Sequence, residues 1–249
     1  MNRRLIAAAS ILLATACMTP SAMQPMAAAD YQVALAARPA ADLARDAARK
    51  PAELLAFAGI RPGDTVGDYI MGGGYFTRVL SSAVGPEGKV YAFQPNEFIA
   101  YRADYAKEQD ETVAALANTE GVRGPGAEPP FLEPLDAIVT IQNFHDLYLS
   151  AGPPGTPQKA AAALYKALKP GGALVVVDHD APAGATDAPD KLHRIEKSRV
   201  VEALTGAGFR LEAESQLFAN SSDARDKLVF DPAIRGKTDQ FTLRFRKPK

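Results

Sequence analysis

Two short polar clusters in the chain carry side chains that can move protons. The first is Gln142-Asn143-Phe144-His145-Asp146 and the second is Asp178-His179-Asp180, and each follows an apolar stretch. Because an imidazole titrates near neutral pH, we expect His145 to act as a general base, with Asn143 and Asp146 beside it in a catalytic site. The alternative interpretation is that Asn143 and Asp146 cap the segment that follows them.

The same clusters contain candidate metal ligands. Asp146, Asp178, His179 and Asp180 offer carboxylate and imidazole groups, which are hard or borderline ligands for divalent ions. Their spacing fits no closed metal-binding pattern, so we expect no metal at this site. For His179, a place in a solvated loop is a further alternative.

A third stretch is suited to binding a ligand through its backbone. It covers residues 68–77 and contains Gly72, Gly73 and Gly74. Glycines between a strand and a helix let the backbone approach a ligand closely, and the start of the helix adds unpaired N–H donors. The alternative interpretation is a tight strand-to-helix turn that binds nothing.

The elements that position these stretches alternate between strands and helices. We expect one α/β domain with a doubly wound, Rossmann-like sheet, mostly parallel, and an antiparallel C-terminal edge strand. A third strand, if present, is short, because residues 121–134 read as a loop. Apolar or alternating runs predict strands at 65–69, 89–93, 135–141, 173–177, 209–217 and 241–246, and helical patterns cover 51–58, 75–84, 98–117, 159–168 and 192–207.

Several motifs then point to a family. The stretch 62–80 resembles the first motif of class I S-adenosylmethionine-dependent methyltransferases, D-x-G-x-G-x-G-x-x-T. The runs Leu-Lys-Pro-Gly-Gly at 168–172 and Ala-Gly-Phe at 207–209 are similar to two further hallmarks of that superfamily. The resemblance covers roughly residues 50–246. It is strongest to a subgroup of predicted bacterial methyltransferases, often exported, whose motifs match residues 143–146, 193–196 and 235–239.

The resemblance implies a cofactor, S-adenosylmethionine, and the residues that hold it. Because the fourth and fifth strands are neighbours in that family, both polar clusters are expected to face the same cleft. Two positions depart from the family pattern: Ile70 replaces the first glycine, and Gln94, with Glu97 nearby, replaces the acid that binds the ribose. The implied cofactor-binding residues are Asp68, Met71, Gly72, Gly73, Gly74, Tyr75, Phe76, Gln94 and Asn143.

The function implied is methyl transfer from S-adenosylmethionine to an oxygen or nitrogen of a small-molecule acceptor. The alternative is a non-catalytic exported binding protein that keeps the methyltransferase fold, since fold alone does not fix function. A nicotinamide oxidoreductase fits less well, because the glycine run is not G-x-G-x-x-G.

The N-terminus has the pattern of an export signal. Arg3 and Arg4 precede an apolar run at 5–16 that is too short to span a membrane, and small residues lead to Cys17. We expect a signal peptide at 1–17, a linker at 18–29 and the methyltransferase-like domain at 30–249. Cys17 resembles the acylated cysteine of bacterial lipoproteins, so we expect the protein in the periplasm or anchored to a membrane through Cys17, with plain secretion as the alternative.

Composition limits the classes of partner. The chain has 249 residues, of which 47% are hydrophobic and 23% charged, with a formal net charge of −1. Such a chain can bury one core, and it lacks the basic excess of a nucleic-acid-binding protein. We therefore expect a small-molecule substrate and no nucleic-acid partner. Cys17 is the single cysteine, so no internal disulfide can form.

Overall fold

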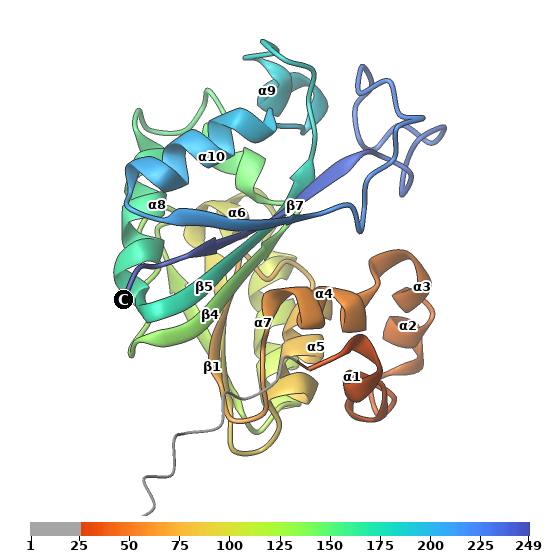
Figure 1. Cartoon of the computed structure of the whole chain (residues 1–249), viewed down its shortest axis with the longest axis vertical. Helices are drawn as coiled ribbons and strands as arrows, with labels where there is room; N and C mark the ends of the chain where they lie inside the picture. The colour runs from red at the N-terminus through yellow and green to blue at the C-terminus, as the bar shows by residue number, and fades with distance from the viewer. Residues whose placement is uncertain (1–25) are drawn as a thin grey trace, which may run out of the picture.

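A seven-stranded sheet lies between two layers of helices in the computed structural model of the chain (Figure 1). The structure describes residues 26–249, so the expected signal peptide, Cys17 and most of the expected linker lie outside the described residues. The first helix of the described residues, α1, begins at Ala28. Within the described part of the chain, every helix falls short of the length or apolar character that crossing a membrane requires.

The strands run in the order β3-β2-β1-β4-β5-β7-β6. Strands β1 to β5 are parallel, and β7 pairs antiparallel with both β5 and β6, which confirms the mostly parallel sheet and its antiparallel C-terminal pair. Strand β7 lies inside this pair, and β6 forms the edge of the sheet. The strands are β1 Thr65–Tyr69, β2 Lys89–Pro95, β3 Thr119–Gly124, β4 Leu135–Ile141, β5 Leu168–His179, β6 Arg210–Ser215 and β7 Gln240–Arg246.

Each face of the sheet carries its own apolar cluster. Val66, Val139 and Val175 face one side, and Ile138 and Leu174 face the other, because neighbouring residues of a strand point in opposite directions. Helices α1, α4 and α5 contribute to the first cluster, and η1, α8 and α10 contribute to the second. The central strands are therefore apolar on both faces, as expected for buried parallel strands.

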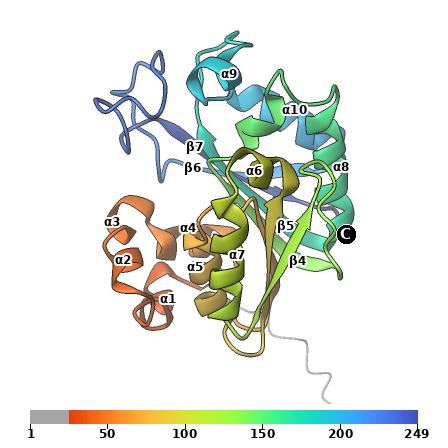
Figure 2. The same ribbon diagram turned by 180° about the vertical axis from the view of Figure 1, so that it is seen from behind.

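The helices are short and follow the strands closely. Figure 2 shows α7 beside α5, on the face opposite α8 and α10. The bounds are α1 Ala28–Leu35, α2 Ala40–Leu43, α3 Asp46–Arg49, α4 Pro51–Ala58, α5 Tyr75–Val84, α6 Asn96–Tyr101, α7 Asp104–Ala114, the 3-10 helix η1 Phe144–Tyr148, α8 Thr156–Ala167, α9 Ala188–Leu192 and α10 Lys197–Gly206.

Two predicted helices are each divided in the structure. The helix expected at 98–117 forms α6 and α7, because Arg102 between them adopts an extended backbone conformation. The helix expected at 192–207 begins only at Lys197, and α9 precedes it. His193 was expected at a helix start, but it lies at the C-terminal end of α9 with a left-handed backbone (φ 50°).

A buried ion pair holds the long connection between β6 and β7 against the region after α9. Arg194 Nη1 lies 2.8 Å from Asp223 Oδ2, with side chains 0% and 2% exposed. Arg194 also donates to the carbonyl oxygens of Lys227 and Asp180. Figure 1 shows this connection, in blue, projecting beyond the sheet next to α9. The pair therefore joins two segments that flank the carboxyl end of β5.

Arg194→Met should destabilise the fold by about 3–5 kcal/mol, because it leaves the carboxylate of Asp223 buried without its partner. The matched control is Lys107→Met, which removes the exposed pair with Glu111 and should cost less than about 1 kcal/mol. The measurement is the free energy of unfolding in urea. Equal losses in the two variants would show that the buried pair has no special role.

Candidate active site

A buried carboxylate and a buried imidazole join the ends of β4 and β5. His145, in η1 after β4, donates from Nδ1 to Asp178 Oδ1 at 2.8 Å, and its backbone N–H donates to Asp178 Oδ2 at 2.8 Å. Asp178, at the end of β5, is fully buried, and His145 is 3% exposed. Because a carboxylate accepts the Nδ1 proton, the neutral imidazole presents its Nε2 as an acceptor.

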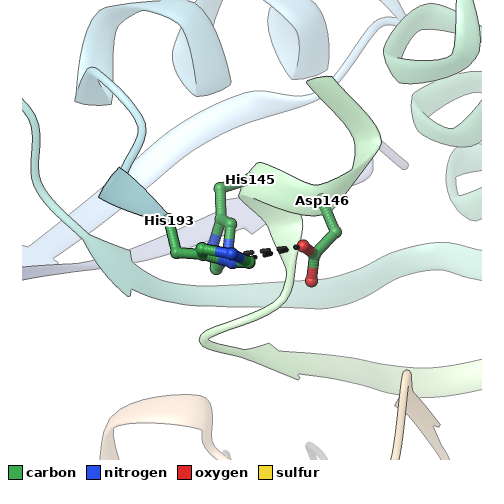
Figure 3. A group of neighbouring side chains, drawn as sticks. All are labelled: His145, Asp146 and His193. Atoms are coloured by element: carbon green, nitrogen blue, oxygen red, sulfur yellow. Dashed lines mark hydrogen bonds and ion pairs between the residues drawn. The ribbon is translucent and has the colours of Figure 1, made fainter. Parts of the chain in front are cut away.

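Two further side chains meet His145 at that Nε2 atom. His193 Nδ1 lies 3.3 Å from it, and Asp146 Oδ1 lies 3.5 Å from it. Figure 3 shows Asp146 and His145 extending from η1 and His193 approaching from the turn after α9. These three residues, which we call the His145 cluster, lie at the carboxyl edge of the sheet, where ligands bind in open α/β folds.

The pKa shifts in the cluster follow from burial and close charges. Burial alone would lower the pKa of His145, but Asp178 and Asp146 together raise it above its ordinary value. Burial also raises the pKa of Asp146 to about 6. The pKa of Asp178 is lowered, because His145 outweighs the effect of burial. Burial and the neighbouring His145 lower the pKa of His193.

Asn143 connects the end of β4 to the turn after β1. Its Nδ2 donates to the carbonyl oxygens of Ile70 (2.9 Å) and Ile141 (2.8 Å). Ile70 and Gln142 both have positive φ, at 67° and 62°. Such a conformation is unfavourable for a β-branched side chain, so the surroundings hold Ile70 in place. The amide of Asn143 therefore fixes the corner where the two strands end.

The three glycines lie in a turn between a strand and a helix, as the sequence predicts. They differ in the space that surrounds each of them. Gly72 and Gly74 have positive φ, and within the described residues no atom lies within 4 Å of a Cβ built on Gly72. A Cβ on Gly74 would lie 2.5 Å from Thr112 Oγ1 and a Cβ on Gly73 would lie 3.5 Å from Glu108 Oε2. Gly74 thus serves the packing of α5 on α7, and Gly72 leaves space above the turn.

The other predicted cofactor residues near this turn point in several directions. Asp68 is buried and accepts from Thr77 Oγ1 at 2.6 Å, and burial raises its pKa to about 6. Met71 is buried, and its N–H donates to Phe93 O. Tyr75 donates to Asp46 Oδ1 at 2.7 Å, so its hydroxyl faces α3. Phe76 lines a cavity of about 30 Å³ with Arg49, Gln142 and Gln240.

Gln94, predicted at the ribose position, is buried without a partner. Its exposed fraction is 0%, and within the described residues neither amide atom forms a hydrogen bond. Burying an unpaired polar group costs about 1–3 kcal/mol, so the unpaired amide of Gln94 destabilises the ligand-free protein. Glu97 is already engaged, because its Oε2 accepts from the N–H of Gly126.

The structure separates some residues that the sequence placed together. His179 bonds Thr238 Oγ1 through Nδ1, and burial lowers its pKa to about 4. Asp180 pairs with Arg225 at 2.7 Å. Neither residue belongs to the His145 cluster, although the His179 ring lies 6.3 Å from the His145 ring between centroids. His193 does join it, although the predicted site did not include it; its sequence signal was the motif at 193–196.

No protein-family profile matches the chain. The chain is similar in sequence to ubiquinone/menaquinone biosynthesis C-methyltransferases. UbiE of Klebsiella pneumoniae is 28% identical over 167 residues, which cover 64% of this chain and 61% of that enzyme. UbiE of an Enterobacter species is 28% identical over 186 residues, which cover 71% of this chain and 68% of that enzyme. The match thus spans about three-fifths to two-thirds of the length of these relatives.

Solved structures identify the fold. A SAM-dependent methyltransferase from Aquifex aeolicus matches with a TM-score of 0.56 and 20% identity, covering 89% of this chain and 99% of that chain. A TehB-like SAM-dependent methyltransferase from Corynebacterium glutamicum matches with a TM-score of 0.52 and 16% identity, covering 88% and 97%. The [4+2]-cyclase SpnF matches with a TM-score of 0.54 and 19% identity, covering 81% of each chain. The protein therefore has the class I SAM-dependent methyltransferase fold.

Gln94→Met should stabilise the ligand-free protein by about 1 kcal/mol, because it removes a buried amide that lacks partners. The control is Gln109→Met, since Gln109 is also buried but donates to Ala92 O and Val122 O. That change should destabilise the protein by about 1–3 kcal/mol. Thermal and urea unfolding of both variants measure the difference, and a loss of stability in Gln94→Met would contradict the unpaired state of Gln94.

Proposed function

We propose that the protein transfers the methyl group of S-adenosylmethionine to an oxygen or nitrogen atom of a small-molecule acceptor. One observation carries the proposal: the open glycine turn after β1 and the His145 cluster after β4 lie at the same edge of a methyltransferase-type sheet. Asn143 links the two directly through its bond to Ile70 O. The methyltransferase relatives support the same reaction class.

The donor side of the site fits S-adenosylmethionine. Gly72 leaves its backbone uncovered, and the amide of Gln94 can both donate to and accept from the hydroxyls of a ribose. The turn leads directly into the N-terminus of α5, which adds unpaired backbone N–H groups. These residues hold and orient the donor, and alignment of donor with acceptor is the main task of the protein in such a transfer.

The acceptor side of the site is the His145 cluster. S-adenosylmethionine supplies a sulfonium methyl group, and when this group leaves, the electrons of its bond remain on sulfur. The acceptor gains a bond to carbon and loses a proton, so a proton-accepting site must face its reacting atom. The cluster combines two imidazoles and a carboxylate in a partly open position, with the His193 side chain 34% exposed. Asn143 shapes this side by fixing the backbone at the end of β4.

A small acceptor agrees with the charge of the protein. The formal net charge is −1, so the chain lacks the positive excess that draws a protein to nucleic acid. The nucleophile is proposed as oxygen or nitrogen because its proton can reach an imidazole directly. Methylation at carbon, the reaction named for the relatives, is a separate outcome of an acceptor screen.

Calorimetric titration of the purified chain with S-adenosylmethionine should give one donor site per chain. His145→Gln keeps an amide donor for Asp178, so it should leave donor affinity within a few-fold and lower turnover by about 10²–10⁴-fold. Gln94→Met should weaken donor binding, because it removes the proposed ribose contact. Turnover is measured by mass increase of acceptors in a screen of hydroxylated and aminated small molecules.

Glu214→Gln is the control for these measurements, since Glu214 lies exposed on the edge strand β6, where it pairs with Lys197 at 2.8 Å. It should bind the donor and turn over acceptors as the unaltered protein does. Absence of donor binding in the unaltered chain would refute the proposed function. Donor binding without methylation of any acceptor would favour the exported binding protein considered from the sequence.

We propose further that the chain is exported, on the support of its N-terminal sequence alone. Cell fractionation of the full chain with a C-terminal tag should recover a shortened protein outside the cytosol. If Cys17 carries a lipid anchor, Cys17→Ser should move the protein from membranes to the soluble periplasmic fraction. Uncut protein in the cytosol would contradict export, and an unchanged distribution of Cys17→Ser would indicate plain secretion.

A further inference from the structure

Three ligand atoms of the His145 cluster lie close to one another. They are His145 Nε2, His193 Nδ1 and Asp146 Oδ1, and they lie within 4.8 Å of one another (Figure 3). The separations are 3.3 Å between the two nitrogens, 3.5 Å from His145 to Asp146 and 3.9 Å from His193 to Asp146. The set contains two imidazole nitrogens and one carboxylate oxygen.

These separations match those around a tetrahedral metal ion. With bonds of about 2.0–2.1 Å, two ligand atoms of a tetrahedral Zn²⁺ lie about 3.3–3.4 Å apart. Two of the three distances are already near this value, and the third requires a movement of about half an ångström at Asp146. An octahedral Mg²⁺ with bonds of similar length would require neighbouring ligand atoms only about 3.0 Å apart, and it prefers oxygen ligands.

Asp178 sets His145 in the form that a metal ligand needs. Because its Oδ1 accepts the Nδ1 proton of His145, the lone pair of the neutral ring is on Nε2, which faces the other two ligand atoms. A carboxylate behind a histidine is the usual support of a metal-bound imidazole. Asp178 is itself held by the backbone N–H groups of His145 and His179, so the ring has little freedom to turn.

The backbone holds His193 in an unfavourable conformation that brings its ring to the cluster. Its φ is 50° and its ψ 49°, in the left-handed region. The Val229 N–H donates to the carbonyl oxygen of Leu192, and the ring of Phe230 lies 5.1 Å from the His193 ring between centroids. An unfavourable conformation that the surroundings maintain is typical of functional sites.

The charges around the cluster leave room for a cation. In residues 26–249, the ion-pair partners of Asp146 are His145 and His193, and no lysine or arginine reaches it. Asp178, next to His145, adds a second carboxylate that is fully buried. The carboxylates of Asp146 and Asp178 thus place negative charge beside two imidazoles in a largely buried position. A divalent cation bound there would neutralise this negative charge.

We infer that His145, Asp146 and His193 bind a divalent transition-metal ion, with Zn²⁺ as the best fit, and leave a coordination position for an oxygen atom of the acceptor. Three protein ligands with an open position are the pattern of catalytic rather than structural zinc sites. The ion replaces the proton that His145 and His193 share in the hydrogen bond between their rings. In this form His145 is a metal ligand and not the general base that the sequence suggested. The bound ion would lower the pKa of an acceptor hydroxyl that it holds, and the proton would leave to water on the exposed side of His193.

The inference reverses the expectation that the site holds no metal. The candidate ligands considered from the sequence were Asp146, Asp178, His179 and Asp180, and only Asp146 is among the three ligands inferred here. The contribution of the ion to methyl transfer rests on the proposed function. Its binding does not, so the two can be tested separately.

The test uses the full chain, freed of metal with a chelator that is then removed. Calorimetric titration with Zn²⁺ should show one ion bound per chain, and Co²⁺ should give the visible absorption of a tetrahedral N/O site. Mg²⁺ should not compete at similar concentrations, because two of the three ligands are nitrogen. Failure of the metal-free chain to bind Zn²⁺ or Co²⁺ would overturn the inference and leave His145 as the general base.

Two variants remove ligands while preserving the shape of the site. Asp146→Asn keeps the volume of the side chain, and His193→Asn suits the left-handed backbone, which asparagine tolerates. Loss of a residue that only supports a metal ligand typically weakens metal binding about 10–100-fold. Each of these variants loses a ligand itself, so each should weaken Zn²⁺ binding by more than that. Glu214→Gln, the control on the edge strand β6, should bind Zn²⁺ as the unaltered chain does. Equal Zn²⁺ affinity in all three folded variants would place the ion elsewhere and refute the assignment.

Titration with S-adenosylmethionine separates this inference from the proposed function. We expect the metal-free chain to bind the donor, because the donor residues lie on the glycine turn and not in the His145 cluster. Donor binding without Zn²⁺ binding would refute the metal site but agree with the proposed methyltransferase function. Zn²⁺ binding without donor binding would do the reverse.

Discussion

The carboxylate of Asp178 is the interaction on which the site depends. It is fully buried, and in the described structure it faces no lysine or arginine, so its charge is offset by hydrogen bonds and by His145. A buried carboxylate is costly unless it is paired. The need to pair this carboxylate holds the end of β5 against the start of η1, and it also sets the orientation of the His145 ring. Asp146 and His193, the other members of the His145 cluster, both lie close to that ring.

Several residues with unfavourable backbone conformations lie at the carboxyl edge of the sheet, near the His145 cluster. Ile70, Gln142 and His193 all adopt positive φ, although none is glycine. Each follows directly on an element that the sheet or its helices hold rigidly: β1, β4 and α9. Asn143 bonds the first of these positions, and the connection from β6 to β7 packs on the third. The packing of the sheet thus stabilises the unfavourable backbone conformations at these three sharp turns.

The comparisons separate the fold from the chemistry. A solved methyltransferase shares the architecture over 99% of its length, and a protein named as a [4+2]-cyclase shares it over 81%. The same sheet can therefore support different reactions, and the identity of the reaction lies in the side chains at the strand ends. In this chain those side chains include Gln94, which has no hydrogen-bond partner in the described structure, and a pair of histidines in contact. Both features are open to direct measurement.

The sequence by itself determined most of the strands and the order of the motifs, although β3 overlaps the range predicted as a loop and β5 is longer than its predicted range. Apolar runs such as 135–141 and 173–177 predict strands because burial on both faces demands them, and strands β1, β4 and β7 match their predicted ranges closely. The resemblance to methyltransferases supplied the family of the fold, which the solved structures confirm. The glycine turn and His145 were singled out because they directly follow predicted strands, at the edge of the sheet where ligands bind in open α/β folds. These are local signals, readable within a few neighbouring positions.

Only the tertiary structure decided which side chains meet. His145 and His193 are 48 positions apart, and their rings meet because α9 ends early and His193 turns back in a left-handed conformation. His179, next to Asp178 in sequence, points instead to Thr238, since alternate residues of a strand face opposite sides. The unpaired state of Gln94 is likewise a property of packing, not of residue type. Contacts between distant segments depend on how whole elements pack, and no local pattern in the sequence encodes that.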